Sequence, residues 1–209
     1  MLIAGVDDAG RGAVIGPLII GGVTFQDNHI PKLKSLGVKD SKVLTPRRRV
    51  ILSQEIKRMA IRWEVVELSP SEVDQIVFEG WKLHRLNWLE AVTMAEVIKR
   101  LHPEVAYVDA SDVNEERFGQ QIKEALPFKV KIISEHYADA NYTIVSAASI
   151  VAKVYRDEVV ARLREKYENF GSGYPSDPKT KQFLLNRVRK GNIPDFVRKS
   201  WKTVKRLVS

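Results

Sequence analysis

The segment Leu2-Ile3-Ala4-Gly5-Val6-Asp7-Asp8-Ala9-Gly10-Arg11-Gly12 joins an apolar run to two carboxylates and a glycine-flanked arginine. Adjacent acids cost free energy when they are buried unless a cation neutralises them, and a hard divalent ion is the usual partner. The glycines let the backbone approach a ligand closely, so that its amides meet phosphate or sugar oxygens. The pattern favours a site for metal and phosphate, although a solvent-facing turn has the same residue types.

Acids also occur at the ends of later predicted strands. Asp109 ends an apolar strand over 104–109, and Asp139 follows a strand over about 128–134. An α/β fold gathers such residues at the carboxyl edge of its sheet. Because neighbouring strand residues point to opposite faces, Asp7 and Asp8 share this site only if the strand already turns at Asp8, which Gly10 would allow. Clustered carboxylates that bind two divalent cations are typical of phosphodiester hydrolysis, so the sequence favours a nuclease.

Periodicity and capping residues indicate the remaining elements. Thr45-Pro46 begins a helix that continues to about residue 60, and the loop that ends at Asp177-Pro178 caps a helix that continues to about 190. A long helix over 143–167 has a first half of small and apolar residues, which we expect to be buried. Further strands are predicted over 2–7, 15–25 and 61–67, and further helices from Pro70, over 81–101 and over 113–125. This order predicts an α/β fold with a mixed sheet flanked by helices and a helical C-terminal annex.

The length and composition restrict the class of protein. A chain of 209 residues suffices for one domain with a small appendage, and we place the division between 1–168 and 169–209. The chain has no cysteine, so a metal must be held by oxygen or imidazole ligands, which favours Mg²⁺ or Mn²⁺. No apolar run is long enough for a membrane span, and no basic leader precedes the first strand. We therefore expect a cytoplasmic protein.

Positive charge is concentrated near the C-terminal end. The net charge is +8, yet residues 1–150 carry 19 basic and 20 acidic side chains, whereas residues 151–209 carry 15 and 6. A basic appendage on a near-neutral body is expected to face a polyanion, and a solvated basic helix is the alternative. Aromatic residues between these charges are interpreted as a stacking surface for nucleic acid, made of Phe170, Tyr174, Phe183, Phe196 and Trp201.

Over nearly its whole length the chain resembles type 2 ribonuclease H (RNase HII), most closely the compact archaeal form. The resemblance rests on several motifs that are weak singly and specific as an ordered set. After the first segment they are Gly16-Pro17, Gly37-Val38-Lys39-Asp40-Ser41-Lys42, Tyr107-Val108-Asp109, Ala138-Asp139 with Tyr142, Ala147-Ala148-Ser149-Ile150-Val151-Ala152-Lys153-Val154 and Gly171-Ser172-Gly173-Tyr174-Pro175-Ser176-Asp177-Pro178.

This resemblance implies an RNase H-like five-stranded mixed sheet and an endonuclease that cuts the RNA strand of RNA/DNA hybrids. It also implies cutting on the 5′ side of a single ribonucleotide embedded in duplex DNA, leaving 5′-phosphate and 3′-hydroxyl ends. Two metal ions, Mg²⁺ or Mn²⁺, would be held by Asp7, Asp8, Asp109 and Asp139.

Substrate contacts are implied in the same way. The backbone of Gly10, Arg11 and Gly12 would bind the ribose 2′-hydroxyl. Tyr174 would stack on the sugar that follows the ribonucleotide and bind the same hydroxyl. Phosphate-positioning roles are implied for Lys39, Ser41, Lys42, Lys153 and Arg156.

Two positions depart from the family pattern. Asp8 stands where the family ordinarily has glutamate, and its shorter side chain is expected to weaken the second metal site or to favour Mn²⁺. Tyr137 stands where the family often has lysine, a change expected to tune metal occupancy or phosphate contact. Asp8 leaves open a second hypothesis, an RNase H-fold nucleic-acid-binding protein with impaired catalysis. A junction resolvase is a third, which the ribose-binding motifs disfavour.

The expected partners are RNA/DNA hybrids and DNA duplexes that contain ribonucleotides, with no membrane. The resemblance alone implies a monomer. The segment Trp201–Ser209 lacks the paired aromatic residues of a sliding-clamp motif, so the sequence does not support a clamp partner.

Overall fold

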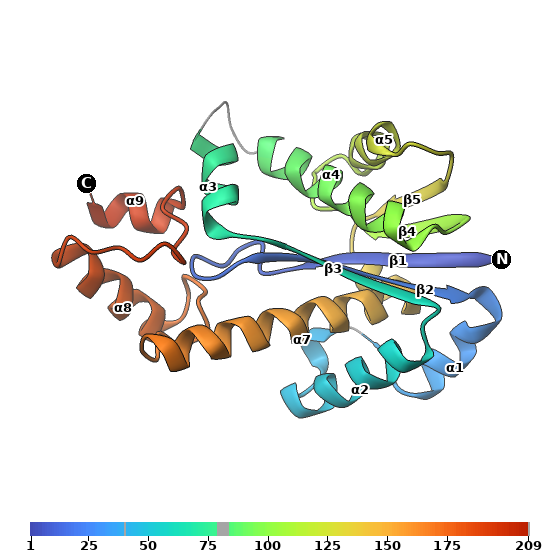
Figure 1. Cartoon of the computed structure of the whole chain (residues 1–209), viewed down its shortest axis with the longest axis horizontal. Helices are drawn as coiled ribbons and strands as arrows, with labels where there is room; N and C mark the ends of the chain where they lie inside the picture. The colour runs from blue at the N-terminus through green and yellow to red at the C-terminus, as the bar shows by residue number, and fades with distance from the viewer. Residues whose placement is uncertain (40, 79–83, 209) are drawn as a thin grey trace.

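The structure is a computed structural model that describes residues 1–39, 41–78 and 84–208 (Figure 1). Within these residues the centre is a five-stranded mixed sheet, as predicted, and its strands lie in the order β3-β2-β1-β4-β5. β2 pairs antiparallel with β1 and β3, whereas β4 is parallel to β1 and β5. The strands are β1 (Leu2–Ala9), β2 (Leu18–Gln26), β3 (Arg62–Leu68), β4 (Val105–Asp109) and β5 (Lys131–Glu135).

Helices cover both faces of the sheet (Figure 1). α7 lies along one face with α1 and α2 beside it, α4 and α5 cover the other face, and apolar side chains fill both interfaces. The described α-helices are α1 (Ile30–Ser35), α2 (Pro46–Met59), α3 (Pro70–Phe78), α4 (His84–Leu101), α5 (Glu115–Ala125), α6 (Ala138–Asn141), α7 (Thr143–Lys166), α8 (Pro178–Arg189) and α9 (Lys202–Val208). None of the described helices combines the length and the apolar character that a membrane crossing requires.

A glycine lets α7 lie directly on the sheet. A Cβ on Gly5 of β1 would lie 2.1 Å from the carbonyl oxygen of Ile144, so any side chain at this position excludes the observed packing. The first half of α7 consists of small and β-branched residues and is buried, which confirms that prediction. The close packing matters for the site because α7 carries Ser149 and Lys153 to the end of β1.

Local capping was predicted correctly. Thr45 Oγ1 accepts a hydrogen bond of 3.3 Å from the amide of Arg48, and Asp177 Oδ1 accepts one of 2.9 Å from the amide of Lys179. β2 starts at residue 18 instead of 15, because residues 10–17 form a loop that begins at Gly10 with a φ of +92°. α1 and α6 were not predicted, since helices of less than two turns show too little periodicity. The predicted start of α4 at residue 81 lies outside the described residues.

Aromatic residues of the annex form a core, which corrects the predicted stacking surface. Phe170, Phe183 and Phe196 are 0%, 5% and 8% exposed, and their ring centres lie 5.6 to 6.1 Å apart. The cluster also contains Ile15 of the loop after β1, which forms an isolated β-bridge with Val197. These rings are buried because the annex helices need a shared apolar core. One apolar cluster thus joins the annex to the body, and their division into two domains stays a prediction.

Candidate active site

The ends of β1 and β4 bring the predicted acids together. These strands are parallel neighbours with Val6 opposite Val108, so Asp7 and Asp109 lie side by side at the same edge of the sheet. Asp139 follows β5 in α6 and is 3% exposed. It is near enough to Asp7 for its charge to contribute to the raised pKa of that carboxyl.

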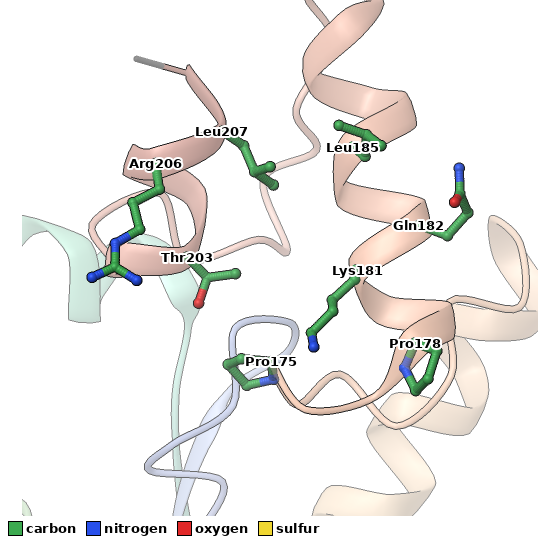
Figure 2. A pocket seen from close by; sticks show the side chains of 8 residues that line it. All are labelled: Pro175, Pro178, Lys181, Gln182, Leu185, Thr203, Arg206 and Leu207. Atoms are coloured by element: carbon green, nitrogen blue, oxygen red, sulfur yellow. The ribbon is translucent and has the colours of Figure 1, made fainter.

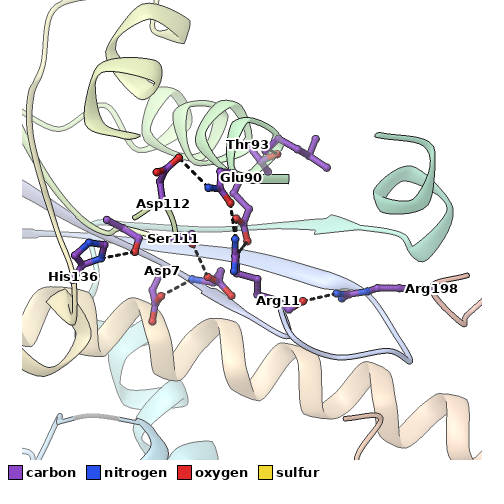
Figure 3. Close-up of polar contacts among 12 residues, drawn as sticks. Asp7, Arg11, Glu90, Thr93, Ser111, Asp112, His136 and Arg198 are labelled. Carbon is purple, nitrogen blue, oxygen red and sulfur yellow. Dashed lines mark hydrogen bonds and ion pairs between the residues drawn. The ribbon is translucent and has the colours of Figure 1, made fainter. Parts of the chain in front are cut away.

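Asp8 joins the group without the early turn that we predicted. β1 continues past it, and Asp8 is still paired with Ile20 of β2. Asp7 and Asp8 therefore point to opposite faces, as strand geometry requires. The Ser149 side chain on α7 forms a hydrogen bond with Asp7. On the other face, the hydroxyl of Ser111 lies 3.3 Å from Asp8 Oδ2 (Figure 3). Both acids nevertheless line one pocket. This is possible because β4 ends beside Asp7 and the pocket opens beyond that edge of the sheet.

The pocket between these elements has a volume of about 280 Å³. It gathers residues from β1, α2, β4 and α7, from the segment before α2 and from the loops before β2 and α8, so residues far apart in the sequence meet in one place. The residues that line it are Asp7, Asp8, Ala9, Gly10, Arg11, Gly12, Ser41, Arg49, Asp109, Ser149, Lys153 and Tyr174.

Negative charge is concentrated in this pocket. Asp7 is 4% exposed, and burial raises its pKa well above the usual value, with the charges of Asp8 and Asp109 adding to the effect. Burial also raises the pKa of Asp8, whereas the nearby Arg11 opposes that shift. The carboxylates therefore need protons or cations to balance them.

A hard divalent cation fits the chemistry of these donors. Carboxylate oxygens are the ligands that Mg²⁺ and Mn²⁺ prefer. In the described part of the chain, no three His, Asp or Glu side chains are already spaced to hold one ion. One oxygen of Asp109 accepts a 2.7 Å bond from the amide of Ala138, and one of Asp7 accepts a 2.7 Å bond from the amide of Asp8. The donor set of a metal centre is present, with two of its carboxylates held by backbone amides.

A buried polar network behind Arg11 was not predicted (Figure 3). Arg11 Nε lies 2.9 Å from the carboxylate of Glu90, and Arg11 Nη2 donates a 2.6 Å bond to Asn87. Asn87 in turn donates a 2.9 Å bond to Asp112. Glu90 is 0% exposed, and burial raises its pKa to about 8, with the charge of Asp8 adding to the shift and Arg11 opposing it.

The sequence contained a signal for this network. Asn87 and Glu90 interrupt a helical stripe whose next members, Met94, Val97 and Leu101, are buried and apolar. Polar residues on a buried stripe need polar partners, so their position on α4 indicates a network. The bonds to α4 hold the Arg11 side chain in place at the border of the pocket, where it is 33% exposed.

Three other predicted substrate residues line the pocket. Ser41 Oγ lies 2.9 Å from Ser149 Oγ, and Tyr174 closes the pocket from the loop before α8. Lys153 is bonded to Asp157 over 2.6 Å, and burial lowers its pKa while Asp157 opposes that shift.

The remaining predicted phosphate-positioning residues are Lys39, Lys42 and Arg156. Lys39 is exposed, and the side chain of Lys42 lies outside the described residues. Arg156 is 1% exposed, and its guanidinium lies 4.7 Å from the centre of the Tyr174 ring. Arg156 therefore supports the tyrosine from behind, which differs from the direct phosphate contact that we predicted.

Arg49 lines the pocket and was missed. It lies on α2, where its guanidinium donates to the carbonyls of Ser41 over 3.1 Å and Leu44 over 2.7 Å. The sequence had no signal to distinguish it, because Arg47 and Arg48 precede it in one basic run.

The loop before α6 contains His136 and Tyr137. His136 has a structural role, since its ring Nδ1 lies 3.2 Å from the carbonyl oxygen of Ala110 (Figure 3). Its amide also donates a 2.7 Å bond to Glu115. Tyr137 is 75% exposed. The position where the family often has lysine thus faces solvent.

A groove of about 530 Å³ lies between α8 and α9 (Figure 2). It begins beside the pocket, because Pro175 follows Tyr174 directly, and it contains the basic side chains Lys181 and Arg206. The residues that line it are Pro175, Pro178, Lys181, Gln182, Leu185, Thr203, Arg206 and Leu207.

Known proteins match this chain over nearly its full length. The family model of ribonuclease HII matches residues 4–204. Ribonuclease HII of Methanosarcina barkeri is 46% identical, over 99% of this chain and 95% of that protein. The crystal structure of ribonuclease H2 from Pyrococcus horikoshii is 43% identical with a TM-score of 0.90, over 100% of this chain and 97% of that one. A structure of the PCNA:RNase HII complex from Archaeoglobus fulgidus is also 43% identical, with a TM-score of 0.89 over 99% and 97% of the two chains.

Proposed function

The chain belongs to the ribonuclease HII family, and we propose that the pocket at the ends of β1 and β4 is its active site. The protein is an endoribonuclease that acts on RNA/DNA hybrids, and its activity depends on a metal ion. The single observation that supports the assignment of the pocket is the buried, mutually repelling group of carboxylates at the edge of the sheet.

Asp7 and Asp109 are the central metal ligands in this proposal, and Asp139 and Asp8 complete the set. Burial and the repulsion from Asp8 and Asp109 raise the pKa of Asp7, and a bound cation would oppose both effects. Two divalent ions held by these carboxylates would supply activation of a water molecule and stabilisation of the leaving oxygen in phosphodiester hydrolysis. The protein's own part is to hold the carboxylates at the ends of two adjacent strands, where backbone amides orient them.

Ribose recognition is assigned to Gly10, Arg11, Gly12 and Tyr174. The Arg11 side chain is bound to Glu90, so the loop presents its backbone to a 2′-hydroxyl. Tyr174 lies across the same pocket with its ring supported by a buried guanidinium. A stacking ring opposite a loop of backbone donors and acceptors suits a ribose at an RNA–DNA junction. We therefore propose that the enzyme also cuts 5′ to a single ribonucleotide in duplex DNA.

Phosphate positioning is assigned to Ser41 and Lys153 in the pocket, with Lys39 and Lys42 retained from the family resemblance. Arg49 joins them because it lines the same pocket. Lys181 and Arg206, in the otherwise largely apolar groove between α8 and α9, would continue this path along the substrate duplex (Figure 2).

Both Mg²⁺ and Mn²⁺ are proposed to support cutting, with Mn²⁺ giving the faster rate. Asp8 has a shorter side chain than the usual glutamate, and Mg²⁺ requires near-ideal octahedral geometry. In this structure Asp8 is also held by Ser111 and by the amide of Arg11.

We propose that the enzyme works as a monomer, while a sliding clamp stays a candidate partner that the C-terminal segment does not itself support. The related protein from Archaeoglobus fulgidus was solved as a PCNA:RNase HII complex. In this chain α9 packs Val204, which is 1% exposed, into the aromatic core of the annex. The same segment lacks the paired aromatic residues of a clamp motif.

The test is cleavage of an end-labelled DNA duplex that contains one ribonucleotide, in Mg²⁺ and separately in Mn²⁺. We expect one cut 5′ to the ribonucleotide, no cut by Asp109→Asn, and a faster reaction in Mg²⁺ by Asp8→Glu. Hybrid binding by Asp109→Asn should stay largely intact. Unchanged turnover in Asp109→Asn would refute the metal-site assignment. Binding without cutting in either metal, with activity restored in Asp8→Glu, would support the alternative of impaired catalysis.

A further inference from the structure

Arg198, a buried residue of the annex, holds the Gly10–Gly12 loop from behind (Figure 3). Its side chain is 0% exposed. Nη1 donates a 2.9 Å bond to the carbonyl of Arg11, and Nε donates a 3.1 Å bond to the carbonyl of Gly16. The backbone amide of Arg198 also donates a 2.9 Å bond to the carbonyl of Val14. One residue of the annex therefore binds both halves of the loop between β1 and β2.

The turn that carries Arg198 is fixed independently of the pocket. Asp74 of α3 is 7% exposed and accepts bonds from the amide of Lys199 over 2.7 Å and the amide of Ser200 over 2.9 Å. The hydroxyl of Ser200 donates to the same carboxylate over 2.5 Å. The ring of Trp201 lies 4.8 Å from the guanidinium of Arg198. The position of this guanidinium is thus set by α3 and the annex.

Burying Arg198 is costly, which argues for a role in positioning. Burial lowers its pKa to about 10, and the charge of Arg156 adds to that effect, whereas Glu90 and Asp8 oppose it. Its Nη2 is buried and has no hydrogen-bond partner among the described residues. Buried charges are often replaceable by apolar residues of similar volume without loss of stability. The free-energy cost of burying Arg198 is therefore better explained by the position in which it holds the loop than by a gain in stability.

Other contacts restrict the same loop from its remaining sides. The carbonyl of Gly10 accepts a 3.1 Å bond from the amide of Ala13, and the Arg11 side chain is bound to Glu90. A Cβ on Gly10 would lie 2.3 Å from Arg156 Nε, so the loop also rests on the arginine that supports Tyr174. With these contacts made, the bond from Arg198 determines where the peptide between Arg11 and Gly12 lies.

We propose that Arg198 is a positioning residue for ribose recognition, which sets the Gly10–Gly12 backbone at the place where it binds a single 2′-hydroxyl. The inference rests on the proposed function. Misplacement by ~1 Å costs on the order of 10²-fold in rate when geometry limits a reaction. An embedded ribonucleotide offers one 2′-hydroxyl, whereas a continuous hybrid offers one at every RNA position. A displaced loop should therefore impair the first substrate more than the second.

The experiment compares Arg198→Lys with Arg189→Lys, a matched substitution on the exposed part of α8. For each protein, kcat and KM are measured on a single-ribonucleotide duplex and on a continuous hybrid, together with Tm and the salt dependence of binding. Arg198→Lys should lose about tenfold or more in kcat/KM on the single ribonucleotide and about threefold or less on the hybrid. Its salt slope should be unchanged because the charge is kept. Arg189→Lys should match the unmodified protein.

A second variant, Asp74→Asn, keeps Arg198 but weakens the turn that holds it, and it should show the same selective loss to a smaller degree. Equal losses on both substrates that follow a lower Tm would make Arg198 a purely structural residue and overturn the inference. Failure of the proposed function is distinguishable, because the unmodified protein itself would then fail to cut 5′ to the ribonucleotide.

Discussion

Replacing Glu90 by glutamine should remove a pH-dependent weakness of the fold. Glu90 has 0% exposure and a pKa of about 8, against the usual value of 4.5. Between these values the folded state keeps a proton that the unfolded chain releases, so stability falls as the pH rises through this window. Because each pKa unit corresponds to about 1.4 kcal/mol, the penalty reaches roughly 5 kcal/mol above pH 8.

The assay is urea unfolding of both proteins from about pH 5 to about pH 8, with divalent metal removed by a chelator. Glutamine keeps an acceptor for Arg11 but does not titrate. The unfolding free energy of Glu90→Gln relative to the unmodified protein should rise by about 3–4 kcal/mol across this range. Taking the difference cancels other titrating groups, such as Asp7.

The matched control is Glu96→Gln on the outer side of α4, where hydrogen bonds from Arg100 and Lys99 lower the pKa. A lowered carboxyl pKa stabilises the fold above the unfolded value, so this control should show a small effect of opposite sign. Parallel pH profiles for the unmodified protein and Glu90→Gln would refute the reasoning, since they would mean that Glu90 titrates alike in both states.

Three further substitutions test the fold and the site. Tyr174→Ala should lower kcat/KM on a single-ribonucleotide duplex by roughly tenfold or more with little change in Tm, because a stacking contact is worth ~1–3 kcal/mol; a normal rate would remove Tyr174 from the site. Phe196→Ala should lower the urea unfolding free energy by about 3–5 kcal/mol, since its ring is 8% exposed in the annex core, and a cost below ~1 kcal/mol would contradict that packing. Gly5→Ala should cost more than about 4 kcal/mol or abolish cooperative unfolding, because its Cβ would lie 2.1 Å from Ile144 O; a Tm close to that of the unmodified protein would show that α7 moves away easily.

The features that were predictable from sequence depend on local signals. Thr45 and Asp177 cap helices through amides two or three residues away, so the whole interaction lies within one short window. Asp7 and Asp109 each follow an apolar run of strand length, and the carboxyl edge of the sheet then brings them together. The pairing of β1 with β4 itself has no signature in the spacing of residues.

The features that were missed depend on tertiary contacts. The sequence shows that Phe183 and Phe196 lie among basic residues, but not that they share a buried face with Ile15. Arg198 binds carbonyl groups 182 and 187 positions away, and a backbone acceptor leaves no mark in the sequence. For the same reason, trimming the chain after about residue 190 would not test the annex charges alone, since it would also remove Phe196 and Arg198 from the interior.

The bridge between Ile15 and Val197 has a consequence for the order of events during synthesis. Residues 10–17 leave the ribosome early, yet the contacts that hold them come from a segment translated more than a hundred codons later. Until residue 198 has emerged, the nascent chain can pair β1 with β2 but lacks the guanidinium that fixes the loop between them. A growing chain with its catalytic acids already in place should therefore be unable to select a ribonucleotide. Selectivity for single ribonucleotides would be gained only on completion of the C-terminal part, and nicking near residue 198 by a protease should remove that selectivity again.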